Sequence, residues 1–133
     1  MNLINEKKEA HKTIREIVTE AETQLGNQYI VLEKPSTRYL IWQALMPRAD
    51  MENILYVVYQ KSSGAWNVLA MRSDLDSFSS RKALPTAWQG LSGDTLVRVS
   101  AVPDAIFCHR SGFLASAKTR EGAVALAEKA CAL

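Results

Sequence analysis

The residues best suited to chemistry lie in one C-terminal segment of the sequence, between His109 and Gly122. Imidazole, hydroxyl and cationic side chains gather there, and each can hydrogen-bond or pair with a phosphate or carboxylate. A helix that begins near Arg120 would add unpaired backbone N–H groups, which also favour an anion. We therefore predict a candidate anion subsite composed of His109, Ser111, Gly112, Lys118, Thr119 and Arg120.

The same segment also has a purely structural interpretation. Thr119 is a natural helix N-cap, because its hydroxyl can accept a hydrogen bond from a backbone N–H of the first turn. Glu121 in that turn would suit the positive end of the helix dipole. Lys118 and Arg120 would then be solvated cations without a ligand, and the residue types alone leave both interpretations open.

The sequence contains no complete catalytic or metal-binding pattern that we recognise. It has two histidines and two cysteines, and it lacks the ligand spacing of zinc sites and the glycine-rich loops that bind nucleotides. Ser111, His109 and Asp104 supply the residue types of a triad, but no nucleophile-elbow pattern surrounds the serine. We predict no catalytic residue, no metal ligand and no cofactor, and we expect this chain alone not to be an enzyme. Cys108 and Cys131 are expected to be reduced thiols.

Aromatic residues are the other group that could contact a ligand. Rings can stack on nucleic-acid bases, but in a globular domain they more often belong to the core or to a half-buried sheet face. The core is therefore the favoured interpretation. The residues concerned are Trp42, Trp66, Trp88, Tyr56 and Tyr59.

The elements that must position these residues follow from the hydrophobic pattern. Apolar residues recur at helical spacing over residues 5–25 and 120–132, which predicts an amphipathic helix at each end. Residues 37–46 fit either a helix or a strand, and we favour a short helix there; another short helix is expected over 94–99. Several β-rich runs lie between, and two pairs of them are joined by short loops that contain glycine, as in β-hairpins. The predicted strands span 29–32, 53–60, 65–72, 105–108 and 113–115.

These elements predict one α+β domain over residues 1–133. We expect a mainly antiparallel sheet of four to five strands, with the N- and C-terminal helices packed on one face. The segment 73–95 is a long loop for a domain of this size, and long loops of this kind tend to be functional or to wrap over the core.

Composition places the chain among ordinary globular domains. It has 133 residues, 47% of them hydrophobic, and a formal net charge of +2, so any basic surface must be local. No apolar run approaches the ~18 residues that cross a membrane, and the first residues contain no apolar signal-peptide region. We expect a cytoplasmic protein that does not bind a membrane.

Part of the sequence resembles a known family. The run HRSGFLASAKTREGAVALAEKA, preceded by LPTAWQGLSGDTLVRVSAVPDAIFCH and NILYVVYQKSSGAWNVLAM, resembles the C-terminal end of the melanocyte-proliferating-gene (MYG) family. The most specific piece is S-G-F followed by K-T-R-E-G-A. The resemblance covers residues 28–133 and leaves the helix over 1–26 outside it. Members of the family are DHH-superfamily proteins, described as metal-dependent hydrolases or exonucleases that act on RNA.

Two departures from the family shape what the resemblance implies. The family's metal ligands lie in an N-terminal half with a D-H-H motif, which this sequence does not contain. The family also often has a Gly-Gly pair after S-G-F, where this sequence has residues 114–117, Leu-Ala-Ser-Ala.

The resemblance implies a non-catalytic, stand-alone domain similar to the substrate-binding C-terminal part of these hydrolases. Its expected partner is RNA or a phosphorylated small molecule. Two alternatives remain open. One is a protein-interaction or homodimerisation module, which would use the sheet edge and exposed aromatic residues. The other is a hydrolase that acts only together with a separate catalytic protein.

Overall fold

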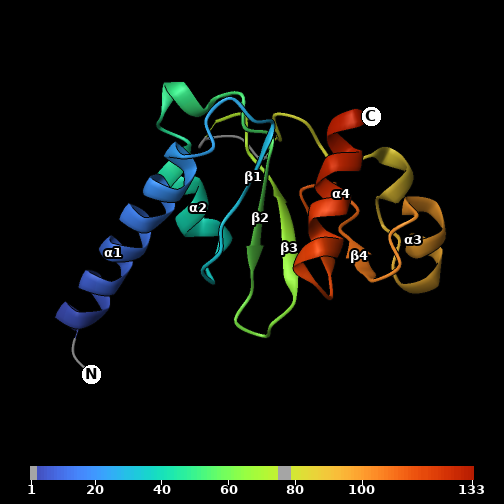
Figure 1. Cartoon of the computed structure of the whole chain (residues 1–133), viewed down its shortest axis with the longest axis horizontal. Coiled ribbons are helices and arrows are strands. Elements are labelled where there is room, and N and C mark those ends of the chain that lie inside the picture. Colours follow the sequence, from blue (N-terminus) through green and yellow to red (C-terminus); the bar gives the residue numbers. More distant parts are fainter. Residues whose placement is uncertain (1–2, 75–78) are drawn as a thin grey trace.

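The chain folds around a five-stranded sheet that carries helices on both faces (Figure 1). The computed structural model describes residues 3–74 and 79–133, with side chains from Thr13 onward, so residues 75–78 of the predicted loop lie outside the described part. The strands are β1 (Tyr29–Val31), β2 (Tyr56–Gln60), β3 (Trp66–Ala70), β4 (Ala105–Cys108) and β5 (Leu114–Ala117). The helices are α1 (Leu3–Glu22), α2 (Arg38–Leu45), α3 (Gly93–Ser100) and α4 (Arg120–Ala132), with 3-10 turns at Ala49–Met51 and Thr86–Trp88.

The strands are arranged in the order β1-β2-β3-β5-β4. The β2–β3, β3–β5 and β5–β4 pairs are antiparallel, and only β1 runs parallel to its neighbour β2 among the described strands. The parallel pair needs a crossover, which α2 supplies between β1 and β2. The predicted α+β fold with a mainly antiparallel sheet is confirmed. Because β5 lies between β3 and β4, the turn before β5 comes close to the end of β3.

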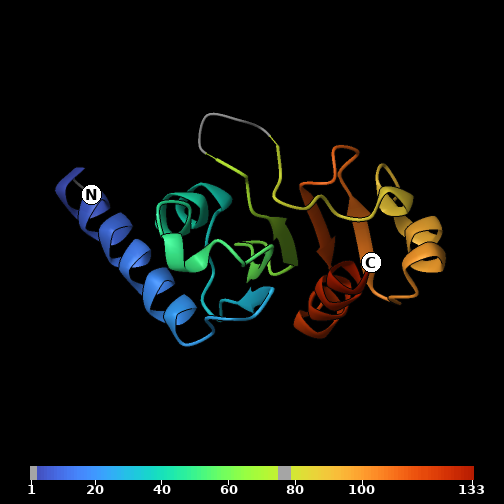
Figure 2. The ribbon, with the colours of Figure 1, turned by 90° about the horizontal axis from the view of Figure 1, so that it is seen from above.

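The prediction that the helices pack on one face is wrong. Tyr56 and Val58 of β2 belong to the core cluster that includes α3 and α4, whereas Val57 and Tyr59 belong to the cluster that includes α1 and α2. Figure 2 shows α1 and α2 on one side of the molecule and α3 and α4 on the other. The strand is apolar at every position from 56 to 59, and a strand of this kind must be covered on both faces.

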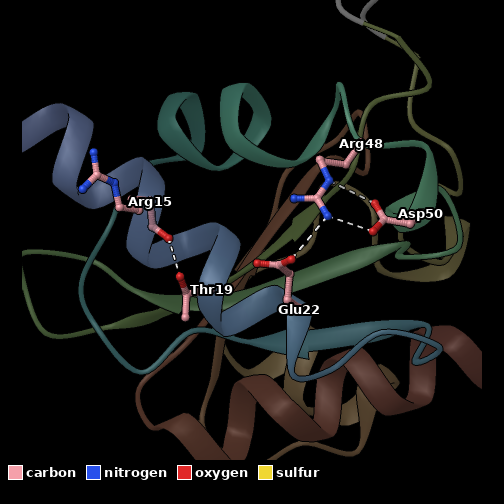
Figure 3. Close-up of polar contacts among 5 residues, drawn as sticks. All are labelled: Arg15, Thr19, Glu22, Arg48 and Asp50. Atoms are coloured by element: carbon pink, nitrogen blue, oxygen red, sulfur yellow. Dashed lines mark hydrogen bonds and ion pairs between the residues drawn. The ribbon is translucent and has the colours of Figure 1, made fainter.

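Polar contacts at the C-terminal end of α1 connect this helix to the segment that follows α2 (Figure 3). The Arg48 guanidinium donates to both carboxylate oxygens of Asp50, at 3.1 and 2.8 Å, and also reaches Glu22 of α1 at 3.5 Å. Within α1, the Thr19 hydroxyl donates to the Arg15 carbonyl at 2.9 Å. Because these contacts are at the surface, they contribute little to stability. The packing of α1 on the domain depends mainly on its buried residues Ile17 and Ala21.

Both edges of the sheet are hydrogen-bonded within the chain. At the β1 edge, the Gln24 side-chain amide acts like a neighbouring strand: it donates to the Val31 carbonyl and accepts from the Val31 N–H, both at 2.9 Å. At the β4 edge, the Cys108 N–H donates to the Leu91 carbonyl, and the Cys108 carbonyl accepts from the Gly90 N–H. Edges that are covered in this way resist pairing with a strand of another chain. None of the described helices is long and apolar enough to cross a membrane.

Candidate functional site

The predicted site residues fall into two groups at opposite ends of β5. His109, Ser111 and Gly112 form the turn that precedes the strand, whereas residues 118–120 follow it. A strand of four residues is roughly 13 Å long, so side chains from its two ends do not reach one ligand atom. The six residues therefore do not form a single cluster.

The second group forms the N-terminus of α4, and a carboxylate of the chain itself occupies it. The Asp104 carboxylate accepts from the Thr119 N–H at 2.8 Å and from the Thr119 hydroxyl at 2.6 Å. The Thr119 hydroxyl oxygen in turn accepts from the Gly122 N–H at 3.0 Å, which confirms Thr119 as the N-cap. The carboxylate lies so close to Gly122 that a Cβ at this position would overlap it. The negative charge that the helix dipole favours is thus already provided by Asp104.

The two cations beside this helix end differ in their contacts. The Arg120 guanidinium pairs with the Glu33 carboxylate at 2.8 Å, and this contact raises the pKa of Arg120 above its usual value. Lys118 is exposed. Binding of an external anion by Lys118, Thr119 and Arg120 stays a prediction, and such an anion would have to share the helix end with Asp104.

The first group forms a tight turn before β5. The His109 Nδ1 atom lies 2.8 Å from the Ser111 hydroxyl and accepts from the Ser111 N–H at 3.1 Å. Gly112 has a φ of 75°, and a Cβ there would lie 2.6 Å from the Gln89 side-chain amide, so both conformation and space require glycine. Asp104 precedes β4 and His109 follows it, so the geometry does not bring Asp104 to the His109–Ser111 pair as a triad would require.

Ser111 opens into a hollow of about 310 Å³ on the surface. This volume lies at the lower end of the range for small-ligand sites. Three separate parts of the chain contribute to it: the first turns of α2, the residues after β3 and the turn before β5. We call it the α2 pocket. The described lining residues are Arg38, Tyr39, Trp42, Arg72, Ser111 and Phe113.

Guanidinium groups lie over aromatic rings in the α2 pocket. The central guanidinium carbon of Arg38 is 4.8 Å from the centre of the Tyr39 ring and 5.7 Å from that of Phe113. The corresponding carbon of Arg72 is 5.1 Å from the Trp42 ring. The face of each ring attracts a cation, so these contacts hold the two guanidinium groups against the rings. Arg38 also donates to the Tyr39 hydroxyl at 3.0 Å.

The rings form a continuous series that links α2 to the turn before β5. Tyr39 meets Trp42 edge-on, with ring centres 6.2 Å apart, and Trp42 lies 6.4 Å from Phe113. Phe113 meets the His109 ring edge-on at 4.7 Å. His109 and Ser111 therefore belong to the border of the α2 pocket rather than to the end of α4.

Local structure explains why α2 presents these side chains. The Thr37 hydroxyl caps the helix by accepting from the Leu40 N–H at 3.4 Å, so the helix begins at Arg38. Residues 38 and 42 are one turn apart and share a face. Trp42 is anchored by its indole N–H, which donates to the Ala70 carbonyl at the end of β3 at 3.4 Å.

A second arginine fixes the main chain that carries Arg72. The Arg81 Nη1 atom donates to the carbonyls of Met51 and Ile54, both at 2.8 Å, and its Nε atom donates to the Arg72 carbonyl at 3.2 Å. Burial lowers the pKa of Arg81, but the group remains a cation because its normal value is far above neutral. Arg81 thus ties the start of the long loop to the segment between α2 and β2.

Four lining residues were not predicted from the sequence: Arg38, Tyr39, Arg72 and Phe113. The spacing of Arg38 and Trp42 was the available signal, because positions i and i+4 of a helix share a face. Of the five aromatic residues considered for stacking, Tyr56, Tyr59 and Trp88 are buried and Trp66 is half-buried. Trp42 is both a core residue and a residue of the pocket: it is 9% exposed, packs in the core and forms the floor of the α2 pocket.

Neither cysteine is placed for nucleophilic chemistry. Both are free thiols, and burial raises the pKa of the Cys108 thiol to about 11, which keeps it protonated near neutral pH. Burial also raises the pKa of Cys131. Across the residues that the structure describes, no group of three or more His, Cys, Asp or Glu side chains converges on a point that could hold a metal ion.

Comparison with known proteins places the chain in a family. The family model MYG1_exonuc, described as an uncharacterised protein family (UPF0160), matches residues 1–131 and so includes α1, which the sequence motifs did not reach. Among curated proteins, the chain is 44% identical over 81 residues to "MYG1 protein C27H6.8" of Caenorhabditis elegans, covering 59% of this chain and 24% of that protein. It is 40% identical over 74 residues to "MYG1 exonuclease" of Homo sapiens, covering 56% and 20%.

A third curated relative gives a similar result. "MYG1 protein" of Dictyostelium discoideum is 38% identical over 76 residues, covering 57% of this chain and 23% of that protein. The chain thus spans about a quarter or less of the length of the curated relatives it matches. No solved structure matches it. The match of the family model over nearly all of the chain shows that this protein belongs to the MYG1 family.

Proposed function

We propose that this chain is a non-catalytic substrate-binding domain that holds one phosphate-bearing unit of RNA in the α2 pocket. The observation that carries the proposal is the pair of guanidinium groups fixed over aromatic rings in one hollow of about 310 Å³. Planar cations in this arrangement suit the phosphate and the flat base of a nucleotide together.

The charge distribution of the pocket supports an anionic ligand. A cage of aromatic rings can also bind a cation, but here the ring faces already carry the chain's own guanidinium groups. A ligand therefore meets the N–H donors of Arg38 and the Ser111 hydroxyl at this surface. Phosphate oxygens are strong acceptors that arginine binds with two parallel hydrogen bonds.

Nucleic acid is the ligand class that the relatives suggest. The human relative's name calls it an exonuclease, and an exonuclease acts on a nucleic-acid chain. Because the matched region is 20% of that protein, catalytic groups can lie in the remainder of such a protein. This favours, as a second candidate, a hydrolase that acts only with a separate catalytic partner, for which the α2 pocket would supply substrate binding.

Protein interaction or homodimerisation through a sheet edge has less support. Gln24 covers one edge and residues 90–91 cover the other by hydrogen bonds within the chain. Among the residues that the structure describes, Tyr39 is the one aromatic side chain in the set of large exposed hydrophobic residues, and it already contacts Arg38. Self-association stays a prediction, to be measured by light scattering.

Fluorescence anisotropy of a short labelled RNA oligonucleotide, titrated with the whole chain at low salt, tests the proposal. We expect saturable binding that weakens as salt is raised, because phosphate contacts release counterions. Arg38→Gln should raise Kd about tenfold, which is the loss of roughly 1.4 kcal/mol. Arg110→Gln is the matched control, because Arg110 is an exposed arginine in the turn before β5 that does not line the pocket. Equal Kd values for the two variants, or no binding by the unmodified chain, would refute the proposal.

A further inference from the structure

The side chains of His109 and Ser111 form a hydrogen-bonded pair in the turn before β5. The His109 Nδ1 atom accepts from the Ser111 N–H at 3.1 Å, so this nitrogen carries no proton and the imidazole is neutral. The Ser111 hydroxyl oxygen lies 2.8 Å from the same nitrogen. Because an unprotonated ring nitrogen can only accept, the hydroxyl donates its hydrogen to His109. The Ser111 oxygen then presents only lone pairs to the α2 pocket.

The neutral form of this pair is poorly suited to a phosphate. Ser111 lines the α2 pocket together with Arg38, and phosphate oxygens accept hydrogen bonds, so the lone pairs of Ser111 face other acceptors. A proton on Nδ1 reverses the pair. The ring N–H then donates to the Ser111 oxygen, and the hydroxyl hydrogen becomes available to the ligand. The protonation state of His109 therefore determines whether Ser111 can donate to a phosphate.

The charges near His109 make its protonation depend on the ligand. The charged and titratable groups of the turn, of α2, of the segment after β3 and of β4 are three cations and a buried thiol: Arg110, Arg38, Arg72 and Cys108. No Asp or Glu is present among the described lining residues of the pocket. In the empty pocket these cations disfavour a positive charge on His109, and protonation would also leave the Ser111 N–H without its acceptor. A bound phosphate supplies the negative charge that offsets both costs.

From this geometry we infer that phosphate binding in the α2 pocket is coupled to proton uptake by His109, a positioning residue that turns the Ser111 hydroxyl toward the ligand. The inference rests on the proposed function, because it concerns the ligand of the same pocket. Since the protonated form binds phosphate better, the affinity for RNA should rise as the pH falls through the range in which histidine gains a proton. Arg38 contributes to binding at every pH, because an arginine stays charged.

Fluorescence anisotropy of a labelled oligouridylate, titrated with the whole chain at fixed salt between about pH 5.5 and 8, tests this coupling. The RNA carries no terminal phosphate, because a phosphate monoester would itself titrate at about pH 6. We expect Kd to be about tenfold lower at the acidic end of the range.

Two histidine variants separate His109 from other sources of pH dependence. His109→Asn places an amide oxygen on Cγ where Nδ1 lies, so it keeps an acceptor for the Ser111 N–H but cannot gain a proton. Its Kd should match that of the unmodified chain at the alkaline end and change by less than about twofold across the range. His11→Asn removes the other histidine of the sequence and should retain the tenfold change.

Calorimetric titration at about pH 6 in two buffers of different ionisation enthalpy counts the protons directly, and it needs only the unmodified chain if His109→Asn does not fold. Binding of the oligouridylate should be accompanied by net proton uptake. Binding without proton uptake, or the same pH dependence in His109→Asn as in the unmodified chain, would overturn the coupling while the proposed function remained. If the RNA did not bind at any pH, the proposed function would fail together with the inference. Circular dichroism shows whether each variant is folded.

Discussion

The α2 pocket and the N-terminus of α4 both gather hydrogen-bond donors, yet they differ in what faces those donors. At α4, the Asp104 carboxylate already accepts from the Thr119 N–H and hydroxyl. In the α2 pocket, the guanidinium groups of Arg38 and Arg72 border a hollow of about 310 Å³. Anion-binding groups therefore mark a ligand site only where they border a space that a ligand can enter. We therefore expect changes at α4 to alter stability and changes in the pocket to alter binding.

The largest effect on stability should follow from Gly122→Ala. The added Cβ would overlap the Asp104 carboxylate and push it away from the N-terminus of α4. Overpacking and loss of the cap together should lower the free energy of unfolding by about 3 kcal/mol, measured by urea denaturation. Thr119→Ala removes the cap without the overlap and should cost only about 1 kcal/mol. A Gly122→Ala protein as stable as the unmodified chain would contradict the close contact between the Asp104 carboxylate and Gly122 at the N-terminus of α4.

Arg81→Met should affect both stability and the α2 pocket. The variant leaves the carbonyls of Met51, Ile54 and Arg72 without their charged donor, which should cost about 2 kcal/mol of unfolding free energy. RNA affinity should also fall, because the main chain of Arg72 is no longer held. A double-mutant cycle with Arg72→Met isolates this link: once Arg72 is gone, Arg81→Met should have no further effect on Kd. Additive losses in Kd would show that Arg81 acts on binding by another route.

Alkaline pH should lower the stability of the protein. Burial raises the pKa of Cys108 to about 11 from 9.0 and that of Tyr56 to about 12 from 10.0. Both residues pack in the core cluster that contains α4. Above pH 9 the unfolded chain loses these protons while the folded chain keeps them, so the unfolded state is favoured as pH rises. Stability should be constant below about pH 9 and decline from there toward pH 12.

Urea denaturation at intervals between pH 7 and pH 11 measures this decline. Cys108→Ala removes the thiol and should flatten the curve between pH 9 and pH 11, the range set by the normal and raised pKa values of this group. A profile that is identical with and without the thiol would show that Cys108 does not contribute to the alkaline decline.

The smallest effect is expected at Ala101, which ends α3 shortly before Asp104. Its φ of 61° places a residue with a side chain in the left-handed region that favours glycine. Ala101→Gly should therefore raise the free energy of unfolding by roughly 0.5–1 kcal/mol, measured as an upward shift of the thermal midpoint. Ala125→Gly, inside α4, is the matched control and should shift it down by a similar amount. A downward shift for both variants would count against relief of strain at Ala101.

Features determined by nearby residues were predictable from the sequence. The cap at Thr119 depends on a hydroxyl and the backbone of the next three residues, so the start of α4 was predicted correctly. The β2–β3 hairpin depends on apolar runs joined by a short loop that contains glycine, and it was also predicted. The coverage of both sheet faces could have been read from the unbroken apolar run at 56–59, which is typical of a doubly buried strand.

Features that depend on the order of strands in space were not predictable in the same way. Asp104 closes the end of α4 from 15 positions before Thr119, because β4 and β5 are neighbours. The α2 pocket exists because β5 lies beside β3, which brings Ser111 close to Arg72, and because α2 crosses over that part of the sheet. No local pattern encodes that order.

The most direct test compares RNA binding by two double variants that each remove two positive charges. Arg38→Gln with Arg72→Gln changes the α2 pocket, whereas Lys118→Gln with Arg120→Gln changes the end of α4. Because the change in net charge is the same, a general electrostatic effect would weaken both equally. We predict that the pocket variant raises Kd at least about tenfold and that the α4 variant stays within about twofold of the unmodified chain. A larger loss in the α4 variant would contradict the assignment of binding to the α2 pocket.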